Sequence, residues 1–184
     1  MDTREQIIQL ADSLIREKGY NAFSFYDISK SVGIKTASIH YHFPSKSDLG
    51  AAVIEKYINN LKIIRKDSEN KSPIENLDML FSIYSIIKNE NKVCLFGSLA
   101  PDFNTLDEKM QESLKIFSDA MIDWVSHFLE VGRKSQVFQF EGLPRTKAIM
   151  IIGNLLSVVL LSRLTSDKDF ETVKETINQE LLKK

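Results

Sequence analysis

The sequence predicts an all-α protein of about nine helices, with an N-terminal three-helix domain containing a helix-turn-helix over residues 1–45 and a larger helical body over 46–184. Hydrophobic residues recur at three- and four-residue spacings along most of the chain, which is the period of a helix with one buried face. Glycine, proline and asparagine interrupt this pattern where helices are expected to end. Alternation typical of a strand occurs only at residues 137–140.

Most of the predicted helices carry a local start or stop signal. Gly19 and Gly33 end the first two helices, because glycine adopts a left-handed conformation without a Cβ penalty. Pro44 ends the third, Ser45 caps the fourth, and Pro73 suits the first turn of the fifth. We expect helices over residues 3–18, 24–32, 36–43, 46–65, 73–89, 106–131, 145–164 and 170–181, with an apolar segment at 94–100, Gly132 closing the helix at 106–131, and loops at 66–72 and 135–142.

Composition limits the class of protein. Hydrophobic residues make up 43% of the chain and charged residues 27%, which excludes a disordered protein. A formal net charge of −1 means that any binding of nucleic acid depends on a local patch. The single cysteine excludes an intrachain disulfide, and the N-terminus lacks a signal peptide. The most apolar stretch, residues 148–161, is too short to cross a bilayer, so we expect a cytoplasmic protein with no membrane partner.

Residues 23–43 carry the strongest functional signal, two short helices joined by a turn at Gly33. Ile28, Val32 and Ile39 are spaced to pack these helices together. In such a motif the second helix lies in the major groove of DNA. The sequence therefore predicts that the remaining side chains of the second helix face DNA.

That outer side is cationic and rich in hydroxyl groups. No acidic residue lies between Lys30 and Lys46. Short side chains at residues 36–38 permit close approach to the groove, and phosphates attract lysine, histidine and tyrosine. The predicted DNA-binding residues are Lys35, Thr36, Ala37, Ser38, His40, Tyr41, His42 and Lys46.

Residues 3–50 resemble the TetR family of bacterial transcriptional regulators. The family pattern is hydrophobic-Gly-hydrophobic, a small residue at the helix start, an aromatic pair and then Phe-x-x-Lys-x-x-Leu. This chain has Val32-Gly33-Ile34, Ala37-Ser38, Tyr41-His42-Phe43 and Lys46-Ser47-Asp48-Leu49 at these places. Lys35 and His40 depart from the pattern, since many members have serine and tyrosine there.

The resemblance implies a homodimer that binds a palindromic double-stranded DNA operator and is released by a small-molecule effector held in the body. It also favours a repressor over an activator. Gly153 and Ser157, four residues apart in the apolar stretch, would allow the close helix approach of a dimer interface. The alternative is a central helix buried inside a monomer.

A set of aromatic and similar side chains supplies candidate walls for an effector pocket. At helical spacing such residues are also the ordinary content of a hydrophobic core, so both interpretations stay open. The predicted ligand-binding residues are Phe81, Tyr84, Cys94, Phe96, Phe103, Phe117, Met121 and Trp124.

Cys94 has two possible roles. It is either a small buried hydrophobic residue or, as in some regulators with a similar Cys-Leu-x-Gly-x-Leu-Ala segment, a sensor of electrophiles or oxidants. The sequence holds no phosphate-binding glycine loop or catalytic triad pattern, and His127 has no partner at metal-ligand spacing. We expect no enzyme activity, no metal and no cofactor. A helical interaction module with a vestigial helix-turn-helix is the alternative function.

Overall fold

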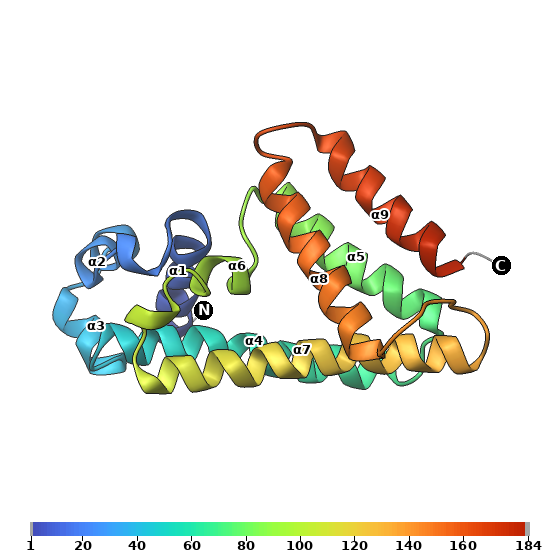
Figure 1. Ribbon diagram of the computed structural model, residues 1–184. Coiled ribbons are helices and arrows are strands. Elements are labelled where there is room, and N and C mark those ends of the chain that lie inside the picture. The colour runs from blue at the N-terminus through green and yellow to red at the C-terminus, as the bar shows by residue number, and fades with distance from the viewer. Residues whose placement is uncertain (1, 183–184) are drawn as a thin grey trace. The chain divides into compact units, whose positions relative to one another are not determined.

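The computed structural model describes residues 2–182, and all regular secondary structure in that range is helical (Figure 1). The elements are α1 (Thr3–Lys18), η1 (Tyr20–Ala22), α2 (Phe25–Val32), α3 (Thr36–His42), α4 (Lys46–Ser68), α5 (Pro73–Asn89), α6 (Leu95–Leu99), η2 (Phe103–Thr105), α7 (Glu108–Lys134), α8 (Pro144–Leu161) and α9 (Asp167–Leu182). The predicted all-α fold is therefore confirmed.

The described chain forms two compact units. The first holds residues 2–60 together with Lys92–Ser118, and the second holds Leu61–Asn91 together with residues 119–182. The long helices α4 and α7 contribute to both units. This division differs from the predicted functional boundary after residue 45, because the first half of α4 packs with the N-terminal helices. The boundary at 45 stays a prediction.

In the first unit, α1 buries one side of an amphipathic helix. Ile7, Ala11 and Ile15 lie four residues apart and are almost wholly buried. Through this side α1 contacts η1, α2, α3 and α6. Gly19 ends the helix with a φ of 93°, a conformation that favours glycine, as expected.

A polar network ties α1 to α4 and to the segment before α6. Tyr57 Oη donates a hydrogen bond of 2.8 Å to Asp12 Oδ1, and Arg16 Nε donates one of 2.9 Å to the Val93 carbonyl. Arg16 is buried and lies 3.6 Å from Asp12, so its charge is compensated. Burial, and next the charge of Asp12, raises the pKa of Tyr57. The phenol therefore stays protonated and keeps its bond to Asp12.

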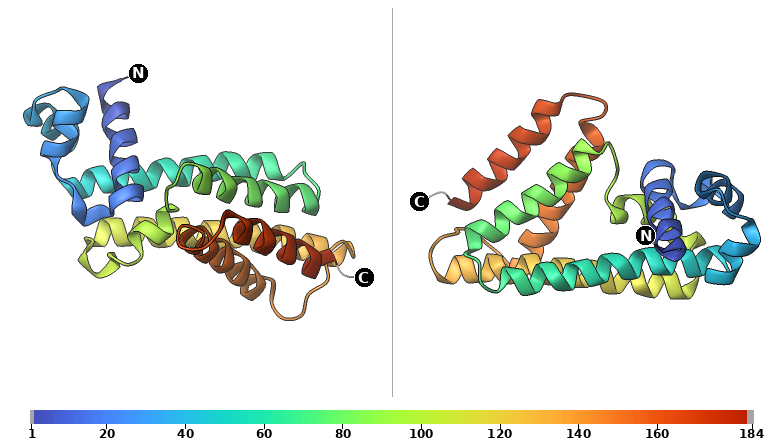
Figure 2. Two further views of the ribbon diagram at one scale, coloured as in Figure 1. Left: turned by 90° about the horizontal axis from the view of Figure 1, so that it is seen from above. Right: turned by 180° about the vertical axis from the view of Figure 1, so that it is seen from behind.

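In the second unit, α8 packs against both α9 and α5 (Figures 1 and 2). Ile151, Leu155 and Val159 form the inner side of α8. Phe170 and Leu181 of α9 are buried as well. These side chains form the hydrophobic core of this unit.

The outer side of α8 is also apolar. Ile149, Met150 and Leu161 are exposed large hydrophobic residues. Gly153 lies among them, and a Cβ built on it would meet nothing within 4 Å. By length and composition α8 is the one described helix that could cross a membrane, which the estimate of residues 148–161 as too short did not anticipate. A single such helix is weak evidence for a membrane span, because a helix that packs on both sides in a protein core has a similar length and composition.

Several predicted boundaries are wrong. α4 continues to Ser68 instead of ending before residue 66, whereas residues 137–140 lie in a loop, as predicted. α8 covers residues 144–161 and not 145–164. Gly132 does not close α7, which runs to Lys134. Tertiary packing explains this glycine, because Cδ2 of the Phe138 ring would lie 2.2 Å from a Cβ at that position.

We expect Gly132→Ala to destabilise the protein, although alanine is normally the better residue inside a helix. The added methyl group would displace the buried Phe138 ring, and overpacking of this kind costs about 1–3 kcal/mol. Urea unfolding followed by circular dichroism measures the loss. Phe138→Leu in the same chain should restore part of it, whereas an unchanged midpoint for Gly132→Ala alone would contradict the contact.

Candidate nucleic-acid interface

The turn between α2 and α3 is built from local signals. At the start of α2, the backbone N–H and hydroxyl of Ser24 both donate to Asp27 Oδ2 at 2.7 Å. At its end, Gly33 has a φ of 75° and its N–H donates to the Ser29 carbonyl. Ile28 and Ile39 are fully buried. The helices therefore pack through Ile28 and Ile39, whereas Val32, the third predicted residue, is half-buried, and the opposite side of α3 is left outside.

That opposite side presents small and polar groups. Ala37, Ser38 and His40 are exposed, and Tyr41 is 85% exposed. Lys35, just before α3, is exposed too. These side chains take no part in the core, so they are available to a binding partner.

Three other predicted DNA-binding residues are only partly exposed, because they contact other parts of the protein. Thr36 and His42 are half-buried. Lys46 lies with its Nζ 4.6 Å from the ring centre of Tyr20 and 4.2 Å from that of Phe23, and it donates a hydrogen bond to the Phe23 carbonyl. Desolvation lowers the pKa of Lys46. This environment favours a positioning role for Lys46, which joins the start of α4 to η1, over a contact with phosphate.

Lys46 and Lys35 have different environments, so replacing each of them by methionine should affect different properties of the protein. Lys46→Met should lower the free energy of unfolding by about 1–2 kcal/mol, because it removes cation–π contacts and a charged hydrogen bond. Lys35→Met should change it by less than about 0.5 kcal/mol but should weaken DNA binding. Thermal melts and fluorescence anisotropy measure the two quantities. Equal melting temperatures for the two variants would contradict the role given to Lys46.

The sequence did not single out Tyr26, which is 67% exposed on α2. Lys30 lies four residues on and is exposed as well. Both positions avoid the buried Ile28, and that spacing could have identified them. They extend the polar surface of the helix-turn-helix to α2.

The predicted ligand-binding residues are divided between the two units. Cys94, Phe96, Phe103 and Phe117 belong to the first unit, where the rings of Phe96 and Phe117 stack at 4.6 Å. The remaining four belong to the second unit, and they are Phe81, Tyr84, Met121 and Trp124. These positions could not be grouped from spacing alone, since they come from helices distant in the sequence.

Cys94 has the environment of a structural residue. It is buried, and its Sγ accepts a hydrogen bond from the Gly97 N–H at the start of α6. Burial raises the pKa of the thiol, which disfavours the reactive thiolate. The geometry thus favours the interpretation as a small buried residue over that of a sensor.

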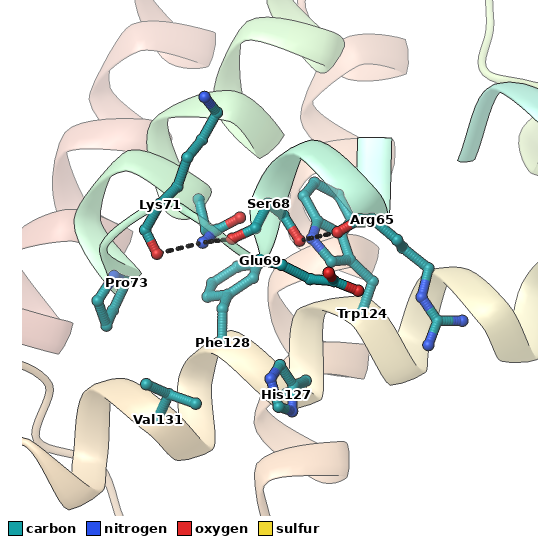
Figure 3. Close-up of a pocket in the computed structure, with 10 residues that line it drawn as sticks. Arg65, Ser68, Glu69, Lys71, Pro73, Trp124, His127, Phe128 and Val131 are labelled. Atoms are coloured by element: carbon teal, nitrogen blue, oxygen red, sulfur yellow. Dashed lines mark hydrogen bonds between the residues drawn. The ribbon is translucent and has the colours of Figure 1, made fainter. Parts of the chain in front are cut away.

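The second unit contains a cavity of about 320 Å³ between the end of α4, the start of α5 and α7 (Figure 3). Figure 3 shows the rings of Trp124 and Phe128 extending from α7 toward the end of α4. Trp124 is the predicted ligand-binding residue that lines this cavity. His127 lies on the same helix and is exposed. Among residues 2–182, His, Cys, Asp and Glu side chains form no group that could hold a metal ion.

A helix-turn-helix with an exposed second helix, joined to a helical body, defines the class of DNA-binding regulators. The family model described as "Bacterial regulatory proteins, tetR family" matches residues 7–53. A TetR transcriptional regulator from Legionella pneumophila is 37% identical, with a TM-score of 0.86 and 98% of each chain covered. The chain belongs to the TetR family, whose members are regulators and not enzymes.

Two further relatives support this assignment. A TetR-family transcriptional regulator from Agrobacterium tumefaciens is 28% identical, with a TM-score of 0.90 and 97% of each chain covered. IcaR of Staphylococcus aureus, the HTH-type negative transcriptional regulator of the biofilm operon icaADBC, is 38% identical over 72 residues. That match covers 38% of this chain and 39% of IcaR.

Proposed function

We propose that this TetR-family regulator is a homodimeric cytoplasmic repressor that places one α3 from each protomer in the major groove of a palindromic operator. A small molecule bound in the second unit releases the DNA. The observation that carries the proposal is the exposed side of α3, where Ala37, Ser38, His40 and Tyr41 lie together without an acidic neighbour in the sequence.

The exposed groups suit two kinds of DNA contact. Ala37 and Ser38 are short, so they allow the helix to approach base edges, which carry sequence information. Tyr41 and Lys35 reach further and suit phosphate oxygens, which position the protein without reading sequence. His40 differs from these exposed residues, because its ring also makes contacts within the chain. The ring lies 4.9 Å from that of Phe25, and Nδ1 is 3.3 Å from the Pro44 carbonyl oxygen.

The outer side of α8 supports the dimer. The exposed apolar side chains of Ile149, Met150 and Leu161 lie within four residues of Gly153 or Ser157, which are exposed as well, as is the polar Asn154. Small residues four apart permit two helices to approach closely. The same face on a second copy of the chain would bury these groups in a symmetric interface, as a two-fold axis requires.

Repression and release rest on separate grounds. IcaR is a negative regulator, and its similarity to this chain supports repression. The helix α4 begins at Lys46, directly after the helix-turn-helix, and its last turns line the cavity with Arg65 and Ser68. A ligand there releases DNA only if it binds the DNA-free state more tightly, and such coupling is usually about 1–3 kcal/mol.

A salt series separates this proposal from an interaction module with a vestigial helix-turn-helix. Fluorescence anisotropy would use labelled DNA from upstream of the protein's own gene. If several phosphates are contacted, affinity should fall by about 10³–10⁵ between roughly 50 and 200 mM salt, because counterions are released. An affinity that is independent of salt and of DNA sequence would favour the interaction module.

A further inference from the structure

The imidazole of His40 is exposed on α3, yet two contacts with the chain hold its ring in place. The ring centre lies 4.9 Å from that of Phe25, at the start of α2, and the two ring planes meet at 71° in an edge contact. Nδ1 lies 3.3 Å from the carbonyl oxygen of Pro44, just beyond the end of α3. These contacts restrict rotation of the side chain, so the Nδ1 edge of the ring is committed to the chain.

The contact with Pro44 decides which ring nitrogen of His40 carries the hydrogen. A carbonyl oxygen only accepts hydrogen bonds, so Nδ1 is the donor. In a neutral imidazole the other nitrogen is then an acceptor. The hydrogen bond therefore leaves a lone pair on Nε2, which lies at the end of the side chain farthest from the backbone. Within residues 2–182, Nε2 has no hydrogen-bond partner.

The described residues place no carboxylate against this ring. No acidic residue lies between Lys30 and Lys46 in the sequence, and no Asp or Glu among residues 2–182 forms an ion pair with His40. Its partners are the uncharged ring of Phe25 and a backbone carbonyl. We therefore take Nε2 of His40 as an acceptor.

An acceptor differs from the other exposed polar groups of this surface. Lys35 only donates, and the hydroxyl groups of Ser38 and Tyr41 can donate. All three can therefore bond to phosphate oxygens, which only accept. Nε2 of a neutral His40 cannot do so. A hydrogen bond between Nε2 and DNA requires a donor on a base edge.

The major groove offers two such donors, the N6 amine of adenine and the N4 amine of cytosine, whereas guanine and thymine present no donor there. We propose that His40 is a specificity-determining residue, whose Nε2 accepts a hydrogen bond from an adenine or cytosine amine in each half-site of the operator. This inference rests on the proposed function, because it requires α3 to lie in the major groove.

Removal of one base amine at a time from the operator tests this contact. 2-Aminopurine replaces adenine and still pairs with thymine, and pyrimidin-2-one replaces cytosine, but neither carries an amine in the major groove. Each adenine and cytosine is replaced in turn, and fluorescence anisotropy measures the affinity. At one position of each half-site, the replacement should weaken binding by wild type at least about fivefold but should not weaken binding by His40→Phe. The comparison identifies the base that His40 contacts, since other side chains also contact bases.

Two polar variants separate the roles of the two ring nitrogens. The amide of glutamine reaches the place of Nε2 and its oxygen accepts, whereas the amide of asparagine reaches only the place of Nδ1. His40→Gln should therefore keep the loss of affinity at the identified position, and His40→Asn should abolish it. All three variants should melt within about 2 °C of wild type, because His40 is exposed.

The results separate this inference from the proposed function. If wild type bound no operator, the proposed function would fail and the inference with it. The inference alone is overturned if wild type binds the operator but no position distinguishes it from His40→Phe. It is also overturned if His40→Phe weakens binding to every sequence alike and lowers the salt dependence by about one phosphate contact, because a charged imidazole on a phosphate gives that pattern.

Discussion

Gly153→Leu should give a folded monomer that binds the operator weakly. A Cβ at Gly153 meets nothing within 4 Å in the chain itself, so the leucine does not disturb the protomer. Leucine is also a better helix former than glycine by nearly 1 kcal/mol. In the proposed dimer, however, this position lies where two α8 helices approach each other. The added side chain would hold them apart and remove the interface.

Loss of the dimer has a large effect on DNA binding. Each protomer then binds one half-site alone, and linked binding of two sites commonly exceeds single-site affinity by about 10²–10⁴. Light scattering on a size-exclusion column measures the mass, and fluorescence anisotropy measures the affinity. Ser82→Leu, an exposed change on α5, is the control and should stay dimeric. A Gly153→Leu protein that remains a dimer at micromolar concentration would contradict the role given to α8.

Ser38→Glu should reduce operator affinity by about 10²–10³ without altering the fold. Ser38 is exposed on α3, so the longer side chain meets no core. A carboxylate there would face the phosphates of DNA, and placing like charges together costs several kcal/mol. Circular dichroism should show an unchanged melting temperature.

Ser38→Gln separates charge from size in this experiment. Glutamine has nearly the same shape as glutamate but no charge, so its effect should be smaller. Raising the salt concentration should narrow the difference between the two variants, because salt screens charge. If Ser38→Glu bound the operator as wild type does, α3 could not be the helix that faces DNA.

Features set by neighbouring residues could be predicted from the sequence. The positive φ at Gly33 and the capping of α5 by Ser72 and Glu75, with Pro73 in its first turn, depend on a few adjacent positions. The buried Ile28 and Ile39 follow from helical spacing. The resemblance to the TetR family arose from this same segment, and it is confirmed.

Features that depend on distant residues could not be predicted in this way. Lys46 turns toward Tyr20 and Phe23, which precede it by more than 20 residues, so the local sequence predicted a contact with DNA instead. The rules for helix ends predicted that Gly132 closes α7, and they could not predict that Phe138 packs against this glycine. The cavity draws on three helices, and spacing along any one of them does not reveal it.

The prediction made from the apolar character of α8 is confirmed only for one side of the helix. Its composition indicated burial on more than one side, yet the described protomer buries one side and leaves Ile149, Met150 and Leu161 exposed. In the proposed dimer, a second copy of the chain would cover this exposed side.

Hydroxyl-radical footprinting on the DNA upstream of the protein's own gene tests the central claim most directly. A symmetric dimer with one α3 in each major groove should protect two half-sites of a palindrome. Their centres should lie about 10 base pairs apart, or a multiple of that, on one side of the duplex. Protection of a single half-site, or of no defined site at all, would contradict the account.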